Sequence, residues 1–236
     1  MRVHEFHPEI WAKAYGLVCD KTNSIILIDP VYDYTEAYQS YLREHSLELQ
    51  AVIATHTHAD HITACFTLKN IHNCDYIMHE STASLGVTLL VDDSTIISFG
   101  GHSIRFHHVP GHTNDSMIVD TGEHLFTGDF LFTGEAGVGR DDLPSGRMEH
   151  HWTSLSKMKS LNGASMMYTG HEPPHTEMKT LAWNWANNPV LNMLSYEEFE
   201  QWQMNTIAKL GSVSKIKTAL PANLFGEVPD HIPWLS

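Results

Sequence analysis

The sequence predicts an α/β fold whose chemistry lies in loops at the ends of strands, and three observations carry this prediction. Short apolar and β-branched runs alternate with helical stretches along most of the chain. A dense group of His and Asp residues, at positions 56–61, directly follows one predicted strand. Three further His or Asp residues, each preceded by glycine, follow later predicted strands. We therefore expect several ligand-bearing loops.

The predicted elements run in order from a buried strand over 24–29, which ends at the turn-forming pair Asp29-Pro30. A helix follows over 34–45, then a strand over 50–55 that stops at His56, and then a helix over 62–70. Further strands are expected over 75–78, 95–99, 103–109, 116–120, 124–127 and 164–168. Helices are expected over 149–161 and 177–185.

No repeat or linker divides the chain, so we expect one domain over 1–236 with a catalytic core over about 20–175. The remainder, 176–236, is expected to be a C-terminal subregion packed on that core, irregular from Asn188 onward. Its large aromatic side chains are expected to anchor it to the core; they are Tyr196, Phe199, Trp202 and Trp234.

Charge and composition exclude several classes of function. The chain has 28 Asp+Glu against 14 Lys+Arg, a formal net charge of −14, so we expect neither nucleic acid nor an anionic membrane as a partner. Eighteen of the 236 residues are histidine, the commonest metal ligand. The N-terminus lacks the apolar core of a signal peptide, and no apolar run is long enough to span a membrane. We therefore expect a soluble, cytoplasmic protein.

The cysteines point the same way. Cys19, Cys65 and Cys74 form no C-x-x-C pair, which argues against a disulfide framework and against a cysteine-built zinc site. A reducing compartment is the simplest interpretation. Cys65 and Cys74 are expected to be small buried hydrophobic residues rather than nucleophiles.

The strongest chemical signal is the H-x-H-x-D-H cluster, which supplies four possible ligands: His56, His58, Asp60 and His61. Imidazole and carboxylate groups bind transition metals. A loop that leaves a strand can turn several short side chains toward one point, whereas a regular strand alternates its faces. The cluster therefore predicts a metal site rather than a solvated polar surface.

Three single residues repeat this context: His112 in Pro-Gly-His-Thr, Asp129 in Thr-Gly-Asp and His171 in Thr-Gly-His. A glycine before each one lets the backbone turn sharply and approach an ion closely. With the first cluster they make seven nitrogen or oxygen ligands. That number suits two adjacent metals, or one metal surrounded by residues that orient its ligands.

The motifs HTHADH, PGHT, TGD and GH, in this order, resemble those of the metallo-β-lactamase superfamily over about residues 20–175. The resemblance implies an αβ/βα four-layer sandwich with the metal site at one edge of two sheets. Within the superfamily the chain is most similar to the glyoxalase II and persulfide dioxygenase group. The segment Gly139–Gly146, GRDDLPSG, resembles the dioxygenases. The short tail after His171 and the sequence Pro221-Ala222-Asn223 agree with that branch.

The dioxygenase resemblance implies one Fe(II) per chain, held by His56, His112 and Asp129. Three protein ligands leave positions for a persulfide sulfur and for O2, and the products would be sulfite and a thiol. The surrounding residues that would orient the ligands and line the cavity are His58, Asp60, His61 and His171. Asp60 and Arg140 are the candidate catalytic residues, with Arg140 either contacting a glutathione carboxylate or pairing with Asp141 or Asp142.

Two alternatives use the same residues. In the first, two Zn(II) ions, or a mixed Zn/Fe pair, hydrolyse a thioester of the hydroxyacylglutathione kind. One ion would be held by His56, His58 and His112 and the other by Asp60, His61 and His171, with Asp129 bridging them. The second is a non-catalytic metal-binding protein.

The expected partners are a small thiol or thioester, O2 and a second copy of the chain in a homodimer. Where the dioxygenases have a tyrosine and an arginine after the last histidine, this sequence has Pro173 and Trp185. We therefore expect the thiol carrier to be held differently from glutathione in those enzymes.

Overall fold

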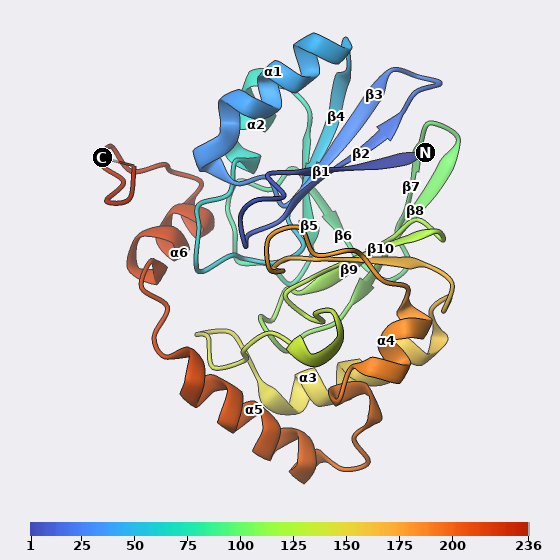
Figure 1. Cartoon of the computed structure of the whole chain (residues 1–236). Helices are drawn as coiled ribbons and strands as arrows, with labels where there is room; N and C mark the ends of the chain where they lie inside the picture. Colours follow the sequence, from blue (N-terminus) through green and yellow to red (C-terminus); the bar gives the residue numbers. More distant parts are fainter. Residues whose placement is uncertain (236) are drawn as a thin grey trace.

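The structure is a computed structural model that describes residues 1–235. Its strands form two sheets (Figure 1). The first sheet has the order β1-β2-β3-β4-β5-β6, and its strands are Arg2–Phe6, Ala14–Cys19, Ser24–Ile28, Glu48–Ile53, Asp75–His79 and Leu89–Val91. The second has the order β11-β10-β9-β8-β7, and in chain order its strands are Ile96–Phe99, His102–His108, Met117–Asp120, His124–Gly128 and Met166–Thr169.

The first sheet changes direction within its run of strands. β1, β2 and β3 pair antiparallel, whereas β3, β4, β5 and β6 pair parallel. β2 and β3 are buried at every position, as expected for strands covered on both faces, and this explains their nearly continuous apolar sequence. The parallel arrangement brings the carboxyl ends of β3 and β4 together at one edge.

The core between the two sheets is built from side chains that alternate along each strand. From the first sheet come Tyr15, Leu17, Ile26 and Ile53, and from the second come Ile104, Phe106, Val119 and Phe126. The β8 pair Ile104 and Phe106 is buried while the intervening Arg105 is exposed, which is the period of two that a strand covered on one face shows.

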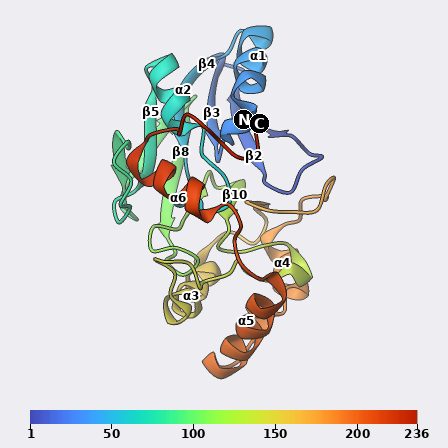
Figure 2. The ribbon, with the colours of Figure 1, turned by 90° about the vertical axis from the view of Figure 1, so that its left-hand side faces the viewer.

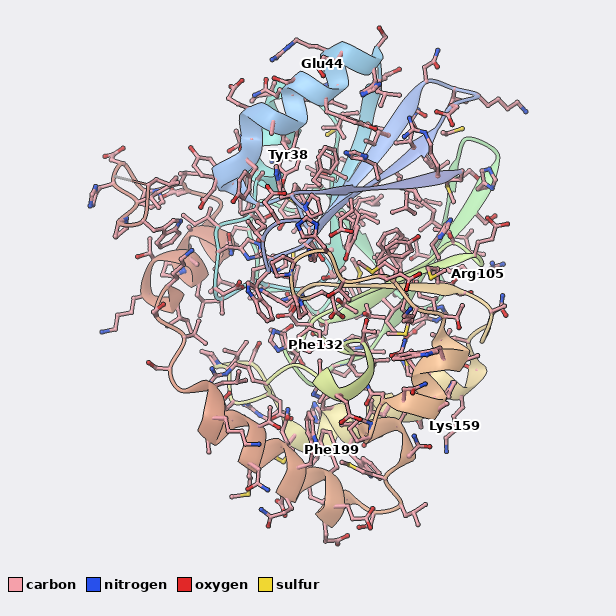
Figure 3. All side chains as sticks on the ribbon, in the orientation of Figure 1. Tyr38, Glu44, Arg105, Phe132, Lys159 and Phe199 are labelled. Atoms are coloured by element: carbon pink, nitrogen blue, oxygen red, sulfur yellow. The ribbon has the colours of Figure 1, made fainter. Side chains whose placement is uncertain are left out.

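Helices cover the outer face of each sheet. On the first sheet lie α1, Thr35–His45, and α2, Cys65–His72, whose Tyr38, Leu42, Phe66 and Leu68 belong to one buried cluster. On the second lie α3, Met148–Leu155, α4, Leu181–Asn187, and α5, Tyr196–Leu210. The two groups of helices occupy opposite ends of the molecule, with the strands between them (Figures 1 and 2). Figure 3 marks one buried side chain under each group of helices, Tyr38 on α1 and Phe199 on α5. The layers are therefore helix, sheet, sheet, helix, as the resemblance to the metallo-β-lactamase superfamily implies.

Most predicted elements are present with small shifts, and some were missed. The helix predicted over 62–70 begins at Cys65, and the helix predicted over 177–185 is Leu181–Asn187. The N-terminal strands β1 and β2 and the short β6 were not predicted. β1 is partly exposed and rich in polar residues, so its sequence lacks a strong strand signal.

The expectation of an irregular C-terminal segment is wrong. α5 begins after Ser195, whose hydroxyl accepts a hydrogen bond from the Glu198 amide, and it ends at Gly211. A further helix, α6, covers Ile216–Phe225. The expected aromatic anchors are confirmed: Phe199 is fully buried, Tyr196 and Trp202 pack on the same cluster, and Trp234 packs beside α6.

The cysteines and the helix lengths complete the description. Cys19, Cys65 and Cys74 are all free, with Cys74 only partly buried. Within residues 1–235, no helix is both long enough and apolar enough to cross a membrane.

Candidate metal centre

Four loops converge at one edge of the two sheets. The loop after β4 carries His56, and it is the only one of the four that comes from the first sheet. The others come from the second sheet: His112 lies between β8 and β9, Asp129 directly follows β10, and His171 follows β11 after one glycine. The predicted placement of these residues at strand ends is therefore confirmed.

The first group of candidate ligands, here called the primary cluster, consists of His56, His112 and Asp129. One ligand atom from each lies within 4.8 Å of the others, and all three residues are buried. Asp129 Oδ2 is 3.6 Å from His112 Nε2 and 4.0 Å from His56 Nε2. Three ligand atoms at these separations can surround one ion.

Hydrogen bonds at the far side of each ring orient the primary cluster. His56 Nδ1 lies 3.0 Å from Thr55 Oγ1, which in turn donates to Asp29 Oδ2 at 2.8 Å. Thr55 therefore accepts from His56, and Nε2 of that ring carries the lone pair. His112 Nδ1 donates to the backbone carbonyl of Arg140 at 2.5 Å. Both rings therefore leave Nε2 available to a metal ion.

The remaining candidate ligands, here called the second cluster, are His58, Asp60, His61 and His171. Ligand atoms of the first three lie within 4.8 Å of one another. His58 Nε2 is 3.2 Å from Asp29 Oδ1, and His61 Nδ1 is 3.2 Å from Asp60 Oδ2. His171 joins the clusters, because its Nδ1 is 2.8 Å from Asp129 Oδ1 and its Nε2 is 2.9 Å from Asp60 Oδ2.

Three buried ring nitrogens in these clusters have no hydrogen-bond partner among the described residues: His56 Nε2, His58 Nδ1 and His61 Nε2. A buried polar atom without a partner destabilises the folded protein unless a bound ion, water or ligand interacts with it. Each of these rings is held at its other nitrogen, so the bare nitrogens have fixed directions. The donor set of imidazoles and carboxylates therefore fits a transition metal.

Burial and charge interactions shift the pKa of residues in both clusters. Burial, and then His58, keep the pKa of His56 well below its ordinary value, so its ring is neutral. Burial acts to raise the pKa of Asp129, but His171 and the other histidines outweigh this and hold it below its ordinary range. Burial acts to lower the pKa of His171, but Asp129 and Asp60 raise it well above the ordinary value. The His171 imidazolium thus lies between two carboxylates.

The glycines before the ligands have different roles. Gly128 has φ +51°, and a Cβ there would collide with Thr55, so the turn into Asp129 requires glycine. A Cβ on Gly170 would collide with Asp129 Oδ1. At Gly111 a Cβ would collide with His151 of α3, so glycine is required there for packing against that helix.

Three supporting residues were not identified as functional from the sequence. Asp29 accepts hydrogen bonds from the Thr55 amide and hydroxyl at 2.7 and 2.8 Å. Asp115 accepts from Thr57 and Thr113, which belong to two different ligand loops. Asn223 of α6 donates to the carbonyls of His58 and His61, 2.9 Å each. Two signals were available: the position of Asp29 at the end of β3, at the edge where β4 also ends, and the sequence Pro221-Ala222-Asn223.

A cavity of about 530 Å³ lies over the clusters. Asp60, His112, Asp129 and His171 line its floor, and Arg140 and Pro173 line its walls. Arg140 pairs with Asp142, with Nε to Oδ1 at 2.6 Å and Nη2 to Oδ2 at 2.7 Å. The pairing with a neighbouring aspartate, one of the two expectations for Arg140, is the arrangement present. Trp185 lies elsewhere, in a separate cavity beside α3.

A family model of the metallo-beta-lactamase superfamily matches residues 12–171, which contain every residue of both clusters. The chain belongs to this superfamily. Its members are enzymes, and the buried His and Asp clusters support a metal cofactor. The layered arrangement of the two sheets agrees with this fold.

The similarity to known proteins extends beyond residues 12–171. The crystal structure of ETHE1 from Myxococcus xanthus matches with a TM-score of 0.87 and 28% identity, covering 95% of this chain and 98% of that one. A hydroxyacylglutathione hydrolase of Francisella tularensis is 27% identical over 84% of this chain and 75% of its own length. A beta-lactamase hydrolase-like protein of Agrobacterium fabrum is 26% identical over 94% of this chain, which spans 59% of that relative.

Proposed function

We propose that this protein is a metal-dependent oxygenase that oxidises an organic persulfide with O2 to sulfite and the parent thiol. The observation that carries the proposal is the difference between the two clusters. In the primary cluster His171 bonds Asp129 through Oδ1, which leaves Oδ2 facing His56 and His112. In the second cluster Asp60 Oδ2 is bonded by both His61 and His171. One metal with three protein ligands keeps open positions for both substrates.

Two further observations support the oxygenase. The GRDDLPSG segment resembles persulfide dioxygenases, and the backbone carbonyl of Arg140 within it receives the hydrogen bond that orients His112. The similarity to ETHE1 covers nearly all of both chains. The residue roles proposed for His56, His112 and Asp129 follow from their geometry and from this resemblance.

The proposed reaction balances with one persulfide, one O2 and one water. The terminal sulfur is oxidised to sulfite, O2 is reduced, the sulfur–sulfur bond breaks, and the thiol leaves together with two protons. Fe(II) held by His56, His112 and Asp129 would supply the positions at which a sulfur and O2 come together.

The residues of the chain position the reactants and handle the protons. Thr55 and the Arg140 carbonyl keep His56 and His112 in the tautomers that expose Nε2. Phe132 and Leu143 exclude water from the cavity walls. The proton on His171 Nε2 faces Asp60 Oδ2, and the Asp60 side chain is 37% exposed, so this pair connects the site to solvent.

A specific observation favours a second candidate, a dinuclear thioester hydrolase. His58 Nδ1 and His61 Nε2 are buried and lack partners among the described residues, as ligands of a further ion would be. The hydroxyacylglutathione hydrolase relatives agree with this candidate. It requires His171 to give up the proton shared with Asp60 before Nε2 can bind a metal.

The experiment compares both reactions on one preparation. O2 uptake with an organic persulfide is measured alongside anaerobic hydrolysis of S-lactoylglutathione. The proposal predicts O2 consumption with one sulfite formed for each O2, and little thioester hydrolysis. Anaerobic thioester turnover at about 1 per second or faster, without O2 uptake on any persulfide, would favour the hydrolase.

A further inference from the structure

We propose that the substrate's organic group is apolar and uncharged, so that the protein acts on an alkyl or aryl persulfide in preference to glutathione persulfide. This inference rests on the proposed function and adds the substrate class. It depends on the walls of the cavity over the metal-binding clusters, on the state of Arg140, and on the exposed apolar side chains that bound the cavity.

The walls are apolar above a polar floor. The side chains that face the cavity beyond the clusters include Phe132, Ala136, Val138, Leu143 and Pro173. Phe132, marked in Figure 3, comes from the segment that follows Asp129. An apolar wall gains free energy when an apolar group displaces water from it, and it offers a carboxylate or ammonium group no partner.

Arg140 is the one Lys or Arg among the described residues that line the cavity, and its charge is already satisfied. Nε and Nη2 form a bidentate pair with Asp142, and Nη1 donates to the Gly211 carbonyl at 2.8 Å. Its side chain is 15% exposed. A substrate carboxylate would have to displace a charge-assisted bidentate pair, which is a strong interaction.

The acidic groups at the cavity disfavour an anionic organic group, because the charge of His171 is already paired with Asp129 and Asp60. Asp60, Asp129 and Glu172 line it, and Glu172 is buried with its carboxylate accepting from the Thr133 amide and the Thr169 hydroxyl. Glutathione carries two carboxylates, so it needs cationic partners that these walls do not provide. An uncharged organic group meets no such requirement.

Exposed apolar side chains bound the cavity on its solvent side. Trp11 is 60% exposed and Leu210 is 57% exposed, and both line the cavity together with Val213. Arg140 fixes this side because its bond to Gly211 holds the end of α5, where Leu210 lies, and the α5–α6 linker, which carries Val213. Large apolar side chains left in water beside a cavity are typical of a surface that a ligand covers.

The first experiment measures O2 uptake by the holoenzyme with 2-phenylethyl persulfide and with glutathione persulfide. We expect kcat/KM to be at least about tenfold higher for the phenylethyl compound, mainly through a lower KM. An equal or higher kcat/KM for glutathione persulfide would overturn the inference while leaving the proposed oxygenase intact.

A binding measurement separates the substrate class from the reaction. Calorimetry compares two unreactive thioethers, 2-phenylethyl methyl sulfide and S-methylglutathione. We expect the apolar thioether to bind at least about tenfold more tightly. Tighter binding of the apolar thioether, combined with no O2 uptake on any persulfide, would support the apolar pocket and contradict the proposed function. Tighter binding of S-methylglutathione would overturn the apolar pocket.

Two variants test the residues that carry the argument. Asp142→Asn leaves the Arg140 guanidinium without its anion, so the preference for the phenylethyl over the glutathione persulfide should narrow about three- to tenfold. The matched control Glu44→Gln removes one negative charge on α1, at the far end of the molecule (Figure 3). A preference equal to that of the wild type in Asp142→Asn would contradict the role given to the Asp142 pair.

The second variant, Trp11→Ser, removes an apolar side chain from the rim of the cavity. It should weaken binding of the phenylethyl thioether several-fold, and Trp11→Phe should restore most of that binding. Equal binding in Trp11→Ser and the wild type would contradict the assignment of this rim as part of the site.

Discussion

The two clusters share one edge of the sheets, yet the chain holds them differently. In the primary cluster the side chains of His56, His112 and Asp129 are 1%, 5% and 9% exposed, and two of the three are oriented by hydrogen bonds to neutral groups. In the second cluster Asp60 and His171 are 37% and 25% exposed and are bonded to each other as opposite charges. His171 also bonds Asp129, but through Oδ1, which leaves Oδ2 facing the imidazoles of His56 and His112. In the second cluster Asp60 Oδ2 is instead bonded by both His61 and His171. We infer that the primary cluster holds the metal on which the function depends.

The largest expected effect comes from removing a primary ligand. His112→Ala and Asp129→Ala should each lose the bound metal and all measurable O2 uptake, because two ligands cannot complete the shell. The loss should exceed the roughly 10- to 100-fold effect of removing an outer partner of a ligand. Metal analysis and O2 uptake check this, with His107→Ala, a histidine paired with Asp120 on β8 and β9, as the control that keeps both. Two metals retained in His112→Ala would contradict the ligand assignment of both candidate functions.

His171→Ala tests whether the second cluster holds a metal. We expect about one metal per chain in both the variant and the wild type, because His171 then serves to orient Asp129 and Asp60. Activity should fall about 10- to 100-fold. His175→Ala, which removes an exposed histidine from the same segment, is the matched control. A fall from two metals to one in His171→Ala would instead identify a dinuclear site.

Asn223 supports the second cluster from outside, because its side chain holds the backbone on either side of Asp60. Asn223→Leu leaves the carbonyls of His58 and His61 and the Thr63 amide without their partner. Each of the three buried groups left without a partner costs about 1 kcal/mol or more, so the free energy of unfolding should fall by about 3 kcal/mol. Urea unfolding measures this. The exposed Asn187, whose side chain donates to Trp183 within α4, gives a control, Asn187→Ala, with a change below about 0.5 kcal/mol. Equal losses in the two variants would contradict the supporting role.

The smallest expected effect concerns a histidine pair outside both clusters. His79 stacks on His108 with ring centroids 3.7 Å apart, and burial followed by repulsion from His108 lowers the pKa of His79 to about 4. Between pH 6.5 and 4 the unfolded chain binds a proton that the folded chain does not, so stability falls as the pH drops through this range. Allowing for solvent screening, the loss is about 1–2 kcal/mol.

A comparison of His79→Gln with the wild type isolates the contribution of His79 to the pH dependence of stability. Urea unfolding at pH 7, 5.5 and 4.5 should show a shallower decline in stability for His79→Gln, because only the wild type loses the His79 contribution. Parallel declines in the two proteins would show that His79 does not titrate as its surroundings imply.

The sequence was sufficient for the parts of the site that depend on local order. The run QAVIAT predicts a strand that stops at His56, and β4 ends at Ile53, so the cluster lies where the strand signal places it. The same holds for Asp129 directly after β10. Strand periodicity and glycine positions are properties of neighbouring residues, which a single sequence displays.

The sequence was insufficient where a contact joins distant segments or uses backbone atoms. Asn223 lies 165 residues from His58, and the partner of His112 is a carbonyl, which any residue at position 140 would provide. Trp11 and Leu210 line one cavity although 199 positions separate them, so its apolar character was not predictable. For α5, in contrast, the sequence Ser195-x-x-Glu198 is typical of a helix N-terminus, so this helix was predictable from local sequence.

The iron and zinc content of the wild-type protein, purified without added metal, tests the central claim most directly. If the primary cluster alone holds the catalytic metal, the protein should contain about one iron per chain and little zinc. Two zinc ions per chain would contradict this account, because the second cluster would then hold a metal as firmly as the first.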